Sequence, residues 1–120
     1  MIDFKTVLKE VIRGIPGSLV AMVIGRDGLI VESYQNAAIG LDREVIGAEY
    51  AGVVSEVHKQ ISILKLDELK DVTVCSDMFT VVAHIISHDY YFVVFLNSQA
   101  NEGLARYKTR VCSLKLRELM

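Results

Sequence analysis

Apolar and polar positions alternate at helical spacing at the start of the chain. Asp3 can cap a helix there, and the cluster from Gly14 to Gly17 ends it, so the pattern predicts an amphipathic helix within residues 2–15. Its charged residues fall on the opposite face. The apolar face comprises Phe4, Val7, Leu8, Val11, Ile12 and Ile15.

Two strand patterns follow, separated by the turn sequence Gly25-Arg26-Asp27-Gly28. An Asp-Gly pair supplies the positive φ that a tight hairpin needs, so we expect strands over 18–24 and 29–34. The first strand does not alternate and should be buried on both faces, whereas the second admits polar residues. A loop is expected over 35–40.

A long helix is predicted over 42–66, with Asp42 as its cap and Glu44 in its first turn. Apolar residues at helical spacing give it one main face. That face comprises Ile46, Tyr50, Val53, Val54, Val57, Ile61 and Leu64.

Small residues form a second feature of this helix. Gly47, Ala51 and Ser55 are spaced four apart, as are Ala48 and Gly52. Because an interior glycine costs a helix about 1 kcal/mol relative to alanine, a packing reason is expected. Two interpretations are open: the strip contacts the same helix in a second copy of the chain, or it lets the helix approach its own sheet closely.

Three further strands are expected over 70–76, 78–87 and 90–98, joined by polar breaks short enough for hairpins. A final amphipathic helix should run from about Ala100 to Leu119, capped by Ser98 or Asn101. The fold class is therefore α+β with the order α-β-β-α-β-β-β-α: an antiparallel five-stranded sheet in three α/β/α layers, with the terminal helices on one face and the long helix on the other. A single domain over 1–120 is expected.

Composition narrows the classes of partner. Hydrophobic residues make up 52% of the 120 residues, an excess that favours burial against another protein. Thirteen basic and fifteen acidic residues are spread along the chain, so we expect no nucleic acid partner. The apolar runs are shorter than the ~20 residues of a membrane span, and no leader is apparent, so we expect a cytoplasmic protein without direct membrane insertion.

Candidate chemistry is sparse. Cys75 and Cys112 are read as reduced thiols, and the three histidines have no metal-ligand spacing, so no metal, cofactor or catalytic residue is expected. His84 is interpreted as a sheet residue, and His88 and Arg26 as solvated turn residues. The sequence from Gly14 to Leu19 lacks the Lys-Ser/Thr pair of a phosphate loop. We therefore expect a protein that is not an enzyme.

The segment IPGSLVAMVIGRDGLIVES, residues 15–33, followed by a long capped helix, resembles the first hairpin of the roadblock family. This family comprises small domains of the dynein light-chain type, related to the profilin and longin folds. The C-terminal helix resembles that of bacterial and archaeal members. The resemblance implies a homodimer formed through the long helix and an adjoining strand, and association with small Ras-like GTPases rather than catalysis.

The expected function is accordingly a homodimeric platform that binds and regulates a Ras-like GTPase. Its expected dimer interface comprises Gly47, Ala48, Ala51, Gly52, Ser55, Val72 and Val74. Two alternatives are open: a structural adaptor in a larger complex, and a small-molecule sensor of the profilin or PAS kind with a pocket between helix and sheet.

Overall fold

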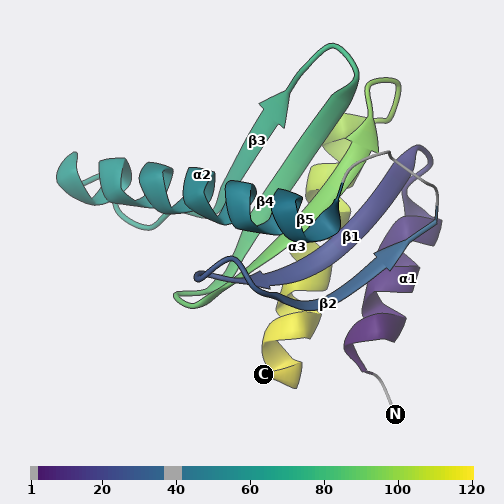
Figure 1. Ribbon diagram of the computed structural model, residues 1–120, viewed down its shortest axis with the longest axis horizontal. Helices are drawn as coiled ribbons and strands as arrows, with labels where there is room; N and C mark the ends of the chain where they lie inside the picture. Colours follow the sequence, from purple (N-terminus) through teal and green to yellow (C-terminus); the bar gives the residue numbers. More distant parts are fainter. Residues whose placement is uncertain (1–2, 37–41) are drawn as a thin grey trace.

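The computed structural model describes residues 3–36 and 42–120, and its elements follow the predicted order (Figure 1). The five strands form one antiparallel sheet in the order β2-β1-β5-β4-β3. The elements are α1 (Phe4–Gly14), β1 (Ser18–Gly25), β2 (Ile30–Gln35), α2 (Arg43–Ile63), β3 (Asp71–Cys75), β4 (Phe79–Ser87), β5 (Tyr90–Asn97) and α3 (Glu102–Leu119).

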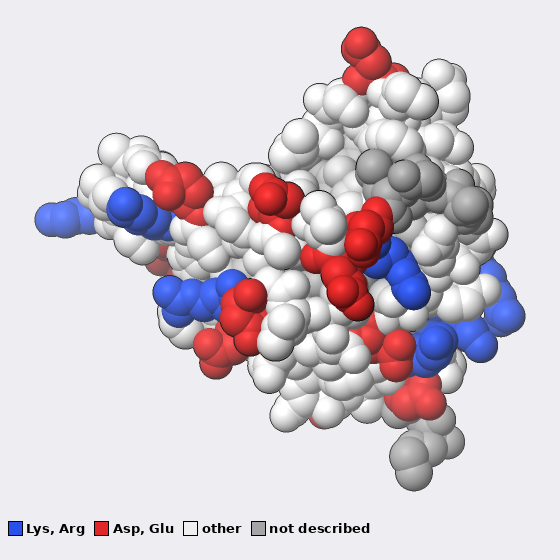
Figure 2. Space-filling model, viewed as in Figure 1, with Lys and Arg blue, Asp and Glu red and all other residues white. Residues whose placement is uncertain are grey.

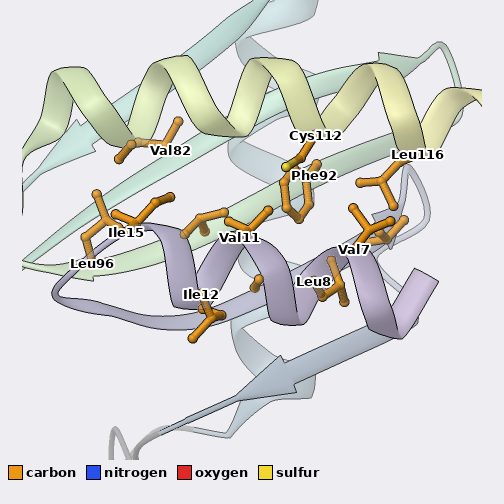
Figure 3. Packing of buried hydrophobic residues seen from close by; sticks show 14 of the residues in the cluster. Val7, Leu8, Val11, Ile12, Ile15, Val82, Phe92, Leu96, Cys112 and Leu116 are labelled. Atoms are coloured by element: carbon orange, nitrogen blue, oxygen red, sulfur yellow. The ribbon is translucent and has the colours of Figure 1, made fainter. Parts of the chain in front are cut away.

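Helices cover both faces of the sheet. Helices α1 and α3 lie side by side on one face, and α2 crosses the other (Figure 1). Figure 3 shows α1 and α3 directing Val11 and Cys112 toward Phe92 of the central strand. This arrangement confirms the predicted three layers, and it leaves two separate buried clusters, one on each side of the sheet.

The strand order explains the burial of the hairpin at residues 15–33. Strand β1 pairs with β2 on one side and with the central strand β5 on the other, so its residues from Val20 to Gly25 are buried. Strand β2 is an edge strand and is only partly buried. The prediction of a buried strand beside a more exposed one is confirmed.

Side-chain caps begin all three helices. Asp3 accepts a hydrogen bond from the Thr6 N–H at 2.8 Å, Asp42 from the Glu44 N–H at 2.9 Å, and Asn101 from the Leu104 N–H at 2.9 Å. Each carboxylate or amide oxygen satisfies a backbone donor that the helix itself leaves unpaired. Asp3 and Asp42 were predicted as caps, and Asn101 is the one used of the two candidates for α3.

The predicted long helix was too long at its C-terminus. Helix α2 ends at Ile63, and the chain then passes through two residues with positive φ, Lys65 at 55° and Asp67 at 78°, that an α-helix does not accommodate. Most of the loop expected over 35–40 lies outside the described residues. Ile2, at the start of the segment predicted to hold the first helix, also lies outside them. No helix among residues 3–36 and 42–120 is both long and apolar enough to cross a bilayer.

Candidate functional site

Helix α2 packs on the sheet through the first three turns of its length. Ile46, Tyr50 and Val54 are buried in the cluster that this helix forms with β1, β5 and β4. The Tyr50 hydroxyl lies 3.3 Å from the Val81 carbonyl oxygen and 3.5 Å from that of Val72, which places this part of α2 above the edge of the sheet. Burial raises the pKa of the Tyr50 hydroxyl, which therefore stays protonated.

The small residues of α2 do not all face the same way. Gly47 is buried, and a Cβ atom there would lie 3.3 Å from Cγ1 of Ile30. Ala51 is also buried, with 2% of its surface exposed. Within the single chain, Gly47 and Ala51 therefore fit the second interpretation, in which small residues let the helix approach its own sheet closely.

The remaining small residues lie on other sides of the helix. Ala48 is exposed, although its backbone supports the turn between β1 and β2. Gly52 is exposed, and a Cβ atom there would meet no atom within 4 Å. Ser55 is half-buried. Gly52 is therefore the position in this strip where a second backbone has room to approach.

The second half of α2 extends past the sheet (Figure 1). The expected apolar face is buried only as far as Val54; Val57 and Ile61 are half-buried, and Leu64 is 61% exposed. Val53, assigned to the same face, is 42% exposed. Within the single chain the sheet therefore covers only the first part of the predicted apolar face, because the sheet ends before the helix does.

Strand β3 is the edge strand beside this part of α2. Val72 and Val74 stand opposite Ala83 and Val81 of β4, and both of these β4 residues belong to the cluster under α2. Directly opposed residues of an antiparallel pair share a face, so Val72 and Val74 lie on the α2 side. Asp71 faces the other side, where its carboxylate lies 3.4 Å from the Arg106 guanidinium of α3.

The apolar residues from the middle of α2 onward and on the α2 side of β3 form one surface, which we call the α2–β3 surface. All of its members are exposed or half-buried. Figure 2 shows charged side chains of both signs along α2, with basic ones at its free end, so charged residues flank this surface. The α2–β3 surface comprises Gly52, Val53, Val57, Ile61, Leu64, Val72 and Val74.

A polar cavity of about 170 Å³ lies between α2 and the turns at the ends of β1 and β4. Its lining includes Arg26 and His88, which are 62 residues apart; the guanidinium Nη1 lies 2.7 Å from the imidazole Nε2. Both are exposed turn residues, as predicted, and the structure adds a direct contact between them. No local sequence signal marks this cavity, because three separate segments build it.

His84 lies in β4, as predicted, and is 9% exposed. Burial lowers the pKa of its imidazole, because the charged form loses hydration; Arg110, Arg117 and Lys70 act in the same direction, and Asp71 partly opposes them.

Cys112 is buried, which raises the pKa of its thiol, and Cys75 is exposed. Within the part of the chain that the structure describes, no three histidine, cysteine or acidic residues gather as a metal site.

Comparison with known proteins gives a relative of substantial identity among the solved structures. MglC from Myxococcus xanthus is 30% identical, the alignment covers 99% of this chain and 100% of MglC, and the TM-score is 0.73. A Roadblock/LC7 domain from Streptomyces avermitilis is 13% identical, with 98% of both chains covered and a TM-score of 0.87. Gliding protein MglB from Thermus thermophilus is 16% identical, with 94% of this chain and 84% of MglB covered and a TM-score of 0.86.

The similarity to the Streptomyces avermitilis domain and to MglB shows that this chain shares their fold. No family model and no curated protein sequence matches the chain. The match to MglC extends over the whole of both proteins, so the α2–β3 surface lies within the aligned region.

Proposed function

Because this chain belongs to the roadblock family, we propose that it is a non-catalytic homodimer that binds and regulates a small Ras-like GTPase in the cytoplasm. The single observation that carries the homodimer is the apolar face of α2, which continues past the edge of its own sheet. A helix exposes such a face when another surface covers it in the assembly. A second copy supplies that surface through the same residues.

The edge strand supports the same arrangement. β3 pairs with β4 on one side only, and an open edge with an exposed valine is a template for pairing with another chain. Two-fold symmetry would bring β3 and α2 of one copy against the same elements of the other. A solved structure described as MglB with a tetrameric arrangement is 14% identical to this chain, and self-association of that protein is in keeping with the proposal.

Charges along α2 are mixed in sign. Arg43, Glu44 and Glu49 lie in the first half, Glu56 and Lys59 lie in the second, and Lys65 follows just beyond its end. These charges do not select between a parallel and an antiparallel pair of helices. A two-fold axis near the middle of the helix would bring the two copies together where Gly52 lies open.

The GTPase partner is proposed from family membership. A platform of this kind regulates by binding one nucleotide-dependent conformation of its partner more tightly than the other, which requires a complementary surface and no reactive group. An exposed arginine can act as an arginine finger, which reaches the nucleotide bound to a partner GTPase. In this chain Nη1 of Arg26 instead donates a hydrogen bond to Nε2 of His88 at 2.7 Å. No role in hydrolysis is therefore assigned to Arg26.

The experiment that tests the partner is a capture from lysate of the native organism with this chain as bait. The lysate is divided between a non-hydrolysable GTP analogue and GDP, and the Gly52→Arg variant serves as a second bait that does not dimerise. Enrichment of a small GTPase in one nucleotide state supports regulation. Recovery of one large complex in both states, without a GTPase, would support a structural adaptor instead.

A further inference from the structure

The cavity beneath the second half of α2 is assembled from three segments. The backbone N–H of Arg26 donates to the Asp89 carbonyl oxygen at 2.8 Å, and this hydrogen bond ties the β1–β2 turn to the β4–β5 turn. Helix α2 covers the joined turns and contributes Ser55, His58, Lys59 and Ser62. The result is a hollow whose floor is fixed by backbone and whose rim is polar.

The charged groups lining this cavity are all basic. Arg26 and Lys59 line it, and neither has a carboxylate within 4.0 Å among the described residues. Asp27 and Asp89 line a neighbouring hollow on another side of Arg26 and are absent from the lining of this one. The cavity therefore presents two cations without a counter-charge inside it.

Tyr91 of β5 is a further residue of this lining. Its side chain lines the cavity and is fully buried, and its hydroxyl has no hydrogen-bond partner among the described residues. A buried hydroxyl without a partner costs free energy, so such groups in folded proteins are usually paired with protein, water or ligand. Tyr91 lines this cavity together with Arg26, Lys59 and two serines.

A contact with His88 orients the Arg26 side chain. A guanidinium only donates, so Nε2 of His88 is the acceptor in this contact. The His58 ring lies edge-on to His88, with ring centroids 6.1 Å apart. His88 thereby holds the guanidinium group of Arg26 in place, and the other N–H groups of the guanidinium are available to a ligand.

We propose that this cavity binds the phosphate group of a small ligand, either inorganic phosphate or a phosphomonoester. Phosphate is a tetrahedral anion with several acceptor oxygens, and the residues that line the cavity include the two cations Arg26 and Lys59 together with Tyr91, Ser55 and Ser62. A carboxylate offers two oxygens in one plane and would leave part of this donor set unused. The site is separate from the α2–β3 surface and does not depend on a GTPase partner.

Isothermal titration calorimetry on the full chain in a phosphate-free chloride buffer tests the site. The probes are inorganic phosphate and glycerol 3-phosphate, with acetate as the planar anion for comparison. We expect saturable binding of one phosphate per chain with a Kd of about 0.1–1 mM, as suits a ligand of few atoms. Tighter binding of inorganic phosphate identifies the free ion as the ligand, and tighter binding of glycerol 3-phosphate identifies a phosphomonoester. Absence of saturable phosphate binding, or equal binding of acetate, would overturn the proposal.

Tyr91→Phe is the decisive variant because it removes one oxygen and keeps the ring. We expect it to weaken phosphate binding roughly tenfold or more, the effect of losing a hydrogen bond to a charged group, while the melting temperature stays the same or rises. Arg26→Ala should weaken binding at least as much. Lys115→Ala, which removes a lysine paired with Glu10 at 3.5 Å on the far face, controls for net charge and should bind as the wild type does. Unchanged affinity in Tyr91→Phe would contradict the site.

Discussion

A Cβ atom placed on Gly28 would lie 3.0 Å from the Cα atom of Ala48. The turn of the first hairpin thus touches the backbone of α2 directly, and Gly28 also has φ of +89°. This contact joins the β1–β2 turn to the helix that carries the proposed interface, so a residue predicted only as a turn glycine also positions α2.

Gly28→Ala should destabilise the protein by about 1–3 kcal/mol, because alanine is strained at positive φ and its methyl group meets backbone that does not yield. Urea unfolding measures the loss. Gly103→Ala is the matched control: Gly103 is exposed in the first turn of α3, where a Cβ atom would lie at an ordinary 3.5 Å from the Asn101 side chain. Equal stability of Gly28→Ala and the wild type would contradict the contact.

Gly52→Ala should have opposite effects on folding and on association. The alanine favours the helix, so the free energy of unfolding should rise by about 0.5–1 kcal/mol in dilute protein. The same methyl group would separate two closely packed helices, so the dimer dissociation constant should increase several-fold. Urea unfolding at low concentration and sedimentation over a concentration series separate the two quantities. A more stable chain with unchanged dimerisation would place Gly52 outside the interface.

Stability should fall as the pH drops below about 6.5, the ordinary pKa of histidine, because burial lowers the pKa of folded His84. The unfolded chain then binds a proton that the folded chain resists, so the contribution is intact above pH 6.5 and is lost as the pH falls toward the folded pKa. Melting temperatures at pH 7.5 and 5.5 measure it. His84→Gln should show a smaller difference between the two pH values than the wild type, and His58→Gln should retain the difference. The same drop in His84→Gln would assign the pH dependence to other groups.

Most of the fold could be predicted from the sequence, because helices, caps and hairpins depend on neighbours in the chain. Asp3 and Asp42 cap the helices assigned to them, and the Asp27-Gly28 pair lies in the expected turn. The end of α2 was predicted too late, since Leu64 and Leu66 continue the apolar pattern while the backbone at Lys65 leaves the helical region.

The candidate sites were harder to predict, because they depend on distant segments. Periodicity grouped Gly47 with Ala51 on one strip but could not show that both settle on their own sheet while Gly52 stays open. Likewise, Arg26 follows β1 and Tyr91 lies in β5, and only the antiparallel pairing of these strands brings them to one cavity. The assignment of the dimer interface stays a prediction.

Sedimentation velocity of the wild type, Gly52→Arg and Gly103→Arg tests the central proposal most directly. Arginine at either position extends from an exposed helical glycine, so both variants should fold, as their circular dichroism would verify. We predict that the wild type and Gly103→Arg sediment at twice the 13.4 kDa mass of the chain, and that Gly52→Arg sediments as a monomer. A monomeric wild type, or a Gly52→Arg dimer as stable as that of the wild type, would contradict dimerisation through the α2–β3 surface.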